Sequence, residues 1–196
     1  MQANADTMAV YDKTGVRTTV SDADLATIAG VGSLYTKARC IHTGASKPIA
    51  STDGSDYTVV ATEVIYAECQ VPLAVTATGV ALFNGSAVAG NVKVGLYKMT
   101  SATVGTLVAT SASTAQSGTD AYQLIPFTAA VDLVPGAYVI AAIGDTGGGT
   151  SKINTHTIGA FAASKLTGQV YATGFPSTLT PATTFTTALG PMASLY

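Results

Sequence analysis

The feature that most limits the fold of this chain is a series of short β-type segments separated by turn residues. From Tyr57 onward, runs rich in Val, Ile, Thr and Tyr recur about every 8–12 residues. β-branched and aromatic side chains fit the pleated surface of a strand, whereas Gly, Asn and Pro favour turns. This spacing is typical of an antiparallel β-sandwich or barrel. The predicted strands span 57–68, 75–83, 91–97, 106–113, 122–128, 137–143 and 169–173.

Three of these segments carry enough pattern to predict which faces are buried. Val92, Val94 and Leu96 alternate with other residues, so they should share one face of a strand. In 75–83 the apolar alternation changes parity at Gly79, which predicts a β-bulge there. Segment 137–143 is apolar at both parities, and we therefore expect a central strand that is covered on both faces.

The two ends of the chain lack this regular pattern. Residues 1–33 are predicted to form an N-terminal arm with a short helix at 21–30, where Ser and Asp residues precede Leu and Ile and Gly follows. A further strand is predicted at 34–41. The Thr- and Pro-rich segment 176–196 is predicted to be an extended C-terminal tail. The fold class is thus all-β: an antiparallel, jelly-roll-like β-sandwich over 34–175, with an arm before it and a tail after it.

Composition restricts the function. Only 10% of the 196 residues are charged, against roughly 25% in an ordinary soluble domain. The nine Lys and Arg residues are scattered and the formal net charge is −2, which argues against a nucleic-acid partner. No apolar stretch approaches the roughly 20 residues of a membrane span, and the N-terminus has no signal-peptide pattern. So few charges protect poorly against self-association, and we expect other subunits to cover much of the surface.

The strongest catalytic candidate is Asp145-Thr146-Gly147, which follows an apolar strand as the Asp-Thr-Gly of aspartic proteases does. That chemistry needs two carboxylates sharing a proton, so one copy of the motif would require a symmetric dimer. A glycine-rich loop is the simpler interpretation. His42 and His156 have no second ligand at metal-binding spacing, and no Gly-x-Ser-x-Gly elbow is present.

The remaining candidate groups also lack partners at the required spacing. Cys40 lies two residues from His42, but a thiolate nucleophile needs an orienting group and a lowered pKa. Cys40 and Cys69 do not form a CxxC motif, and free buried thiols are preferred over a disulfide. We therefore predict no enzyme, no catalytic, cofactor or metal residues and no cofactor. The groups weighed and interpreted as structural are Glu63, Glu68, Asp120 and Asp132 as a glycosidase set, Asp53 and Asp56 as a calcium loop, and Tyr97, Tyr122, Tyr138 and Tyr171 as a sugar platform.

Residues of roughly 62–144 resemble a β-sandwich module that recurs in tailed-phage structural proteins. The resemblance is carried by Val-Ala-Leu-Phe-Asn-Gly at 80–85, Gly-Asn-Val-Lys-Val-Gly-Leu-Tyr at 90–97, Ser-Ala-Ser-Thr at 111–114 and Leu-Val-Pro-Gly-Ala-Tyr-Val-Ile-Ala at 133–141. The family often has a second aromatic residue where this chain has Val139. The resemblance implies a jelly-roll-like sandwich on a virion and brings no catalytic residues with it.

These observations together predict a bacteriophage virion structural protein. We expect a capsid decoration or head-fibre subunit, made in the host cytoplasm and located in the virion. Its expected partners are its own copies, with a trimer as the candidate homo-oligomer, and the major capsid protein or another virion protein. Nucleic acid and membrane are not expected partners. The alternative is a tail accessory or glycan-binding β-sandwich module used in host attachment.

Overall fold

The computed structural model describes residues 7–11, 17–21, 54–154, 163–167, 170–181 and 190–196. The chain divides into two compact units, Met1–Cys40 and Ile41–Tyr196. The described part of the first unit is an antiparallel hairpin of β1 (Thr7–Tyr11) and β2 (Arg17–Ser21). The predicted helix, apart from Ser21 at the end of β2, and the predicted strand at 34–41 lie outside the described residues.

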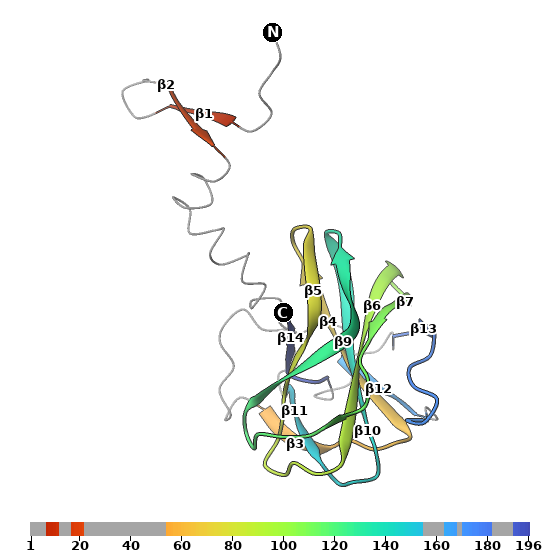
Figure 1. Cartoon of the computed structure of the whole chain (residues 1–196). Coiled ribbons are helices and arrows are strands. Elements are labelled where there is room, and N and C mark those ends of the chain that lie inside the picture. Colours follow the sequence, from red (N-terminus) through yellow and green to blue (C-terminus); the bar gives the residue numbers. More distant parts are fainter. Residues whose placement is uncertain (1–6, 12–16, 22–53, 155–162, 168–169, 182–189) are drawn as a thin grey trace. The chain divides into compact units, whose positions relative to one another are not determined.

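The described part of the second unit is an all-β sandwich of two antiparallel sheets (Figure 1). The first sheet has the strand order β12-β4-β10-β6-β7-β13, and β8 pairs with the start of β6. Its strands are β4 (Glu63–Val71), β6 (Asn91–Ser101), β7 (Val104–Thr110), β8 (Thr114–Ala115), β10 (Gly136–Gly144), β12 (Ala163–Thr167) and β13 (Thr178–Leu179).

The facing sheet is built around β5. On one side β5 pairs with β9, and on the other it pairs with β14. Beyond the end of β5, an antiparallel bridge joins Asn84 to Ser151 of β11, and β11 in turn pairs with β3. The strands are β3 (Gly54–Thr58), β5 (Val75–Phe83), β9 (Tyr122–Leu133), β11 (Thr150–Asn154) and β14 (Ala193–Leu195).

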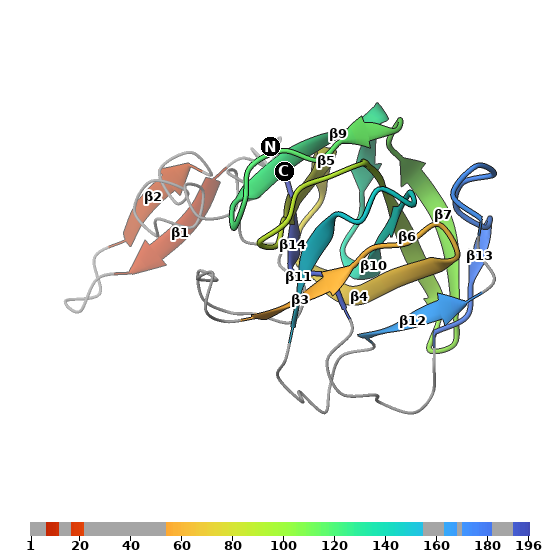
Figure 2. The same cartoon turned by 90° about the horizontal axis from the view of Figure 1, so that it is seen from below.

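This connectivity is that of a jelly roll. Taken in chain order without the short β8, the eight strands β3 to β11 cross between the layers at every step except the β6–β7 hairpin, giving β3-β11-β5-β9 in one sheet and β4-β10-β6-β7 in the other. Seen along the strands in Figure 2, the two sheets form opposite walls, with β12 and β13 at the margins. The predicted all-β, antiparallel sandwich is confirmed.

An inner core fills the space between the sheets. Val92, Val94 and Leu96 point into it, as their alternation predicts. Gly79 marks the predicted change of parity, because the β5–β9 register shifts between Ala77 and Gly79. The buried residues of the inner core are Val59, Ile65, Cys69, Val71, Ala77, Val80, Leu82, Val92, Val94, Leu96, Ile125, Phe127, Leu133, Tyr138, Ile140, Ala142, Ala193 and Leu195.

A second apolar cluster lies on the other face of the β4-β10-β6 sheet. We call it the outer cluster, and the segment 170–181 packs over it with Tyr171, Phe175 and Leu179. β10 therefore contributes to both clusters, and the prediction that 137–143 is covered on both faces is confirmed. The buried residues of the outer cluster are Val64, Tyr66, Tyr97, Val139, Ala141, Ile143 and Leu179.

The structure differs from the predicted strands at two places. The predicted strand 57–68 is two strands, because the chain crosses between the sheets after β3. The connection at 59–62 is Val-Val-Ala-Thr, with Val59 buried in the inner core, so none of the strong turn residues Gly, Pro, Asn or Asp marks the crossing. The predicted strand 169–173 is instead a turn in its described part, where the amides of Thr173 and Gly174 donate to the Val170 carbonyl.

Residues 176–196, predicted as an extended tail, contribute two strands to the sandwich. β13 pairs with β7, and β14 pairs with β5. The carbonyl oxygen of Tyr196 accepts hydrogen bonds from the amides of Thr78 and Gly79 at the register shift. Leu179 and Leu195 are fully buried, so the few large apolar residues of this Thr-rich segment are what hold it on the sheets.

Leu179→Ala should lower the free energy of unfolding by about 2–5 kcal/mol, because it leaves a cavity in the outer cluster. Val170→Ala, in the same segment but 49% exposed, is the matched control and should change it by less than about 0.5 kcal/mol. Urea unfolding measures both. Equal, small effects of the two substitutions would show that the segment does not pack on the sheet.

Candidate functional site

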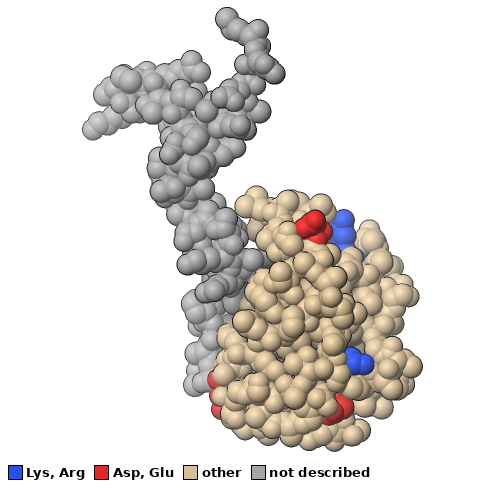
Figure 3. All heavy atoms as spheres, viewed as in Figure 1, with Lys and Arg blue, Asp and Glu red and all other residues tan. Residues whose placement is uncertain are grey.

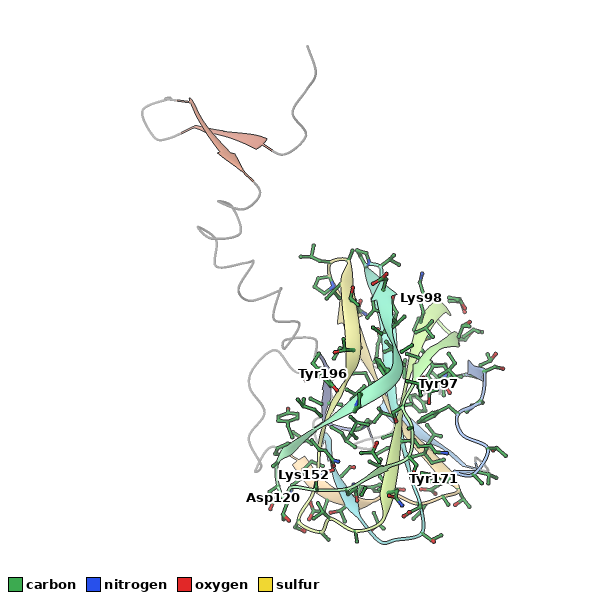
Figure 4. The ribbon with its side chains drawn as sticks, viewed as in Figure 1. Tyr97, Lys98, Asp120, Lys152, Tyr171 and Tyr196 are labelled. Atoms are coloured by element: carbon green, nitrogen blue, oxygen red, sulfur yellow. The ribbon has the colours of Figure 1, made fainter. Side chains whose placement is uncertain are left out.

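Among the described residues, a group of ionisable side chains meets at one end of the sandwich, around Lys152. Its ammonium group is 2.7 Å from Asp56 Oδ1 and 3.0 Å from Asp120 Oδ1. β11 supplies Lys152, the neighbouring strand β3 supplies Asp56, and Asp120 belongs to the loop before β9. Figure 4 shows Lys152 and Asp120 together at this end. We call Asp56, Asp120 and Lys152 the ion cluster.

The contacts in the ion cluster favour the charged forms of Asp56 and Lys152. Hydrogen bonds from Lys152 and Ser86 lower the pKa of Asp56 despite its partial burial. The two carboxylates raise the pKa of Lys152 in turn. A protonated lysine amine is not a nucleophile, and an aspartate with a lowered pKa is a poor general acid at neutral pH. The arrangement is suited to joining strands and a loop rather than to catalysis.

Behind the ion cluster lies a network of amide side chains. Asn84, which is fully buried, donates to the Ser117 carbonyl at 2.7 Å and to Gln123 Oε1 at 2.9 Å. Gln116 donates to Asn84 Oδ1 at 3.3 Å. These bonds fix the 115–121 loop against the end of β5. Because Asn84 is buried and bonded, the Asn84-Gly85-Ser86 sequence serves as a structural turn.

Asp145, the strongest catalytic candidate in the sequence, closes a loop. Its Oδ2 accepts hydrogen bonds from the backbone and side-chain amides of Asn91, at 2.8 and 2.9 Å, and its Oδ1 accepts one from the Gly147 amide at 2.8 Å. Burial raises the pKa of Asp145, but the hydrogen bonds from Gly147 and Asn91 outweigh it, and the net shift is downward. Both oxygens therefore tie the β10–β11 loop to the start of β6.

The candidate tyrosines do not form one platform. Tyr97 and Tyr138 are buried and bonded to the Pro176 and Val134 carbonyls. Tyr171 lies on a different part of the sandwich from the ion cluster (Figure 4), with Lys93 Nζ 4.3 Å from its ring centre. Tyr122 is 38% exposed and packs on Phe83, with 4.7 Å between ring centres.

The other candidates are separated or lie outside the described residues. Glu63 and Glu68 both belong to β4, where their odd spacing places them on opposite faces, and Glu63 accepts a hydrogen bond from Tyr57. Asp132 bonds to Thr76 at 2.6 Å. Within the part of the chain that the structure describes, no group of three or more His, Cys, Asp or Glu residues could hold a metal ion. His42, His156, Cys40 and Asp53 lie outside it.

Lys152 was not among the candidates taken from the sequence. Its partners Asp56 and Asp120 are distant in sequence, and no local motif links the three. The sequence shows only that Lys152 is a single lysine in a short strand that follows a Gly-rich loop. Lysine is rarely buried without a carboxylate partner, but the sequence does not show that this lysine is 8% exposed.

Comparison with known proteins gives no identification. No protein-family model matches the chain, and no curated protein matches it. In the described residues, no helix is long and apolar enough to cross a membrane. The function must therefore be argued from the geometry of the sandwich and its surface.

Asp56→Asn should make stability less dependent on pH in acid. The native pKa of Asp56 is lowered, so its ion pair stabilises the fold above its ordinary value of 3.8, and this stabilisation is lost as the pH falls below that value. The difference in the free energy of unfolding between wild type and Asp56→Asn should therefore shrink as the pH falls from 6 to 2. Asp132→Asn, which removes a carboxylate bonded to Thr76, is the control for charge. Parallel curves for wild type and Asp56→Asn would contradict the ion pair.

Cys69 should be inert to thiol reagents in the native state. It is a free thiol, fully buried in the inner core, and burial raises its pKa. In a Cys40→Ser background, Ellman's reagent should react with Cys69 only after denaturant unfolds the chain. Rapid reaction of the native protein would show that the inner core opens at β4.

Proposed function

We propose that this chain is a structural subunit of a phage virion, a capsid decoration or head-fibre protein that binds the phage shell and neighbouring copies. The observation that carries the proposal is the surface of the jelly roll. Figure 3 shows a face with few charged side chains, most of it formed by other residue types. Such a surface suits burial against other subunits better than free exposure to solvent.

The use of the ionisable side chains supports a role in binding rather than in catalysis. Asp56, Asp120 and Lys152 join strands to a loop, and Asp145 closes another loop. The Cys69 thiol is enclosed in the inner core. Groups with these fixed structural partners are not poised to exchange protons with a substrate.

The fold agrees with this proposal, but the fold alone does not distinguish it from other functions. Jelly rolls form viral capsid domains, and the same architecture serves lectins and cupins. The resemblance of residues 62–144 to tailed-phage sandwich modules favours the virion among these uses. Two sheets with a packed interior provide the rigid body that a decoration or fibre subunit needs.

A tail accessory or glycan-binding module is the second candidate. The observation in its favour is that Tyr122 is 38% exposed and follows closely after Asp120, whose side chain is 41% exposed. An exposed aromatic ring can hold the apolar face of a sugar, and a nearby carboxylate can accept hydrogen bonds from its hydroxyl groups. Specific binding on a glycan array that is lost in Tyr122→Ala would favour this candidate over the shell-binding one.

Attachment to particles tests the proposal directly. Purified phage particles should contain the chain in many copies, as measured by quantitative mass spectrometry. Purified chain should also rebind particles that lack it, whereas a variant without residues 1–30 should keep the sandwich fold, checked by circular dichroism, and fail to attach. Complete infectious particles without the chain would overturn the virion proposal, and full attachment of the truncated variant would overturn the role of the arm.

A further inference from the structure

The outer face of the β5–β9 sheet carries an exposed apolar strip. Along β9 the outward positions are Tyr122, Leu124 and Pro126, all exposed, with Leu124 at 61%. A sheet with one face in solvent normally shows polar residues at such positions. Beside them on β5 lie Phe83, opposite Tyr122, and Ala81, opposite Leu124. Phe83 and Ala81 are themselves buried, at 5% and 7% exposure, so the surface that faces water belongs to the three β9 residues. We call Tyr122, Leu124 and Pro126 the apolar strip.

The strip contrasts with the outer face of the other sheet. There the outer cluster is covered by the chain's own segment 170–181, so its large residues are buried. Among the described segments, β14 pairs along the edge of β5 and β11 joins the end of β5 through the Asn84–Ser151 bridge; both extend the sheet at its edge. Leu124 is the most exposed large apolar side chain of the described residues.

The strands on either side of the strip carry no charged side chains along its length, and the nearest charge in sequence is Asp120, two residues before Tyr122. Residues 77–83 of β5, 122–131 of β9 and 193–195 of β14 include no Asp, Glu, Lys or Arg. Charged residues occur only towards the ends, at Asp132 and at the ion cluster. An uncharged apolar surface is compatible with itself, because two copies can meet without like-charge repulsion or the desolvation of ions.

We propose that the apolar strip is a contact between two copies of this chain. The proposal rests on the proposed function, which brings many copies close together on a particle. The N-terminal unit is a poorer occupant, since Met1–Cys40 carries eight charged residues, namely Asp6, Asp12, Lys13, Arg17, Asp22, Asp24, Lys37 and Arg39. The strands of the two copies would stack face to face, as sheets do in a sandwich.

Leu124→Glu tests the contact in the full chain. Sedimentation velocity over a concentration series should show self-association of the wild type, weakened by at least about tenfold in Leu124→Glu, because a carboxylate must be desolvated in the contact. Leu73→Glu is the matched control: it makes the same change at a side chain that is 51% exposed in the turn between β4 and β5, and it should associate as the wild type does. Equal association of all three proteins, or a wild type that stays monomeric at every concentration, would overturn the proposal.

A labelling experiment separates a second copy from other occupants. In a Cys40→Ser background, Leu124→Cys should react with maleimide quickly in dilute protein and more slowly as concentration rises, while Leu73→Cys should react equally at all concentrations. Protection that is already complete in dilute monomer would mean that the chain itself covers the strip, and would overturn the proposal.

If the chain is absent from particles yet the strip still associates, the virion proposal fails and the contact stands. If the chain is present on particles while Leu124→Glu associates normally, the contact fails alone.

Discussion

The burial of β10 on both faces is the constraint on which the rest of the sandwich depends. Its alternate side chains enter the inner core and the outer cluster, so neither face of the β4-β10-β6 sheet can be left in water. The facing sheet covers one side. The chain's own segment 170–181 covers the other, which is why a Thr- and Pro-rich end of the sequence becomes part of the fold rather than a free tail.

Two sets of ionic side chains join separate elements of the described sandwich. Lys152 joins β11 to β3 and to the loop before β9, and Asp145 ties the β10–β11 loop to β6. These groups shape the end of the sandwich. The apolar strip on β9 carries the most exposed large apolar side chain of the described residues.

The sequence predicts the strands whose apolar residues follow a period of two or are apolar throughout, as in 91–97 and 137–143, because burial alone sets their pattern. It does not predict the crossing after β3, since buried Val59 carries no turn signal. The turn after Val170 has strand-like residues, and its hydrogen bonds override their preference. The ion cluster could not be predicted from the sequence, because its three residues are distant along the chain and the jelly-roll topology brings them together.

Amide hydrogen exchange of the full chain tests the double burial of β10 most directly. If both clusters are packed, the β10 amides between Tyr138 and Ile143 should exchange only through global unfolding, with protection equal to the free energy of unfolding measured in denaturant. Exchange of these amides at the faster rates of strand edges would contradict the account, because it would mean that one face of the central strand opens to water in the native protein.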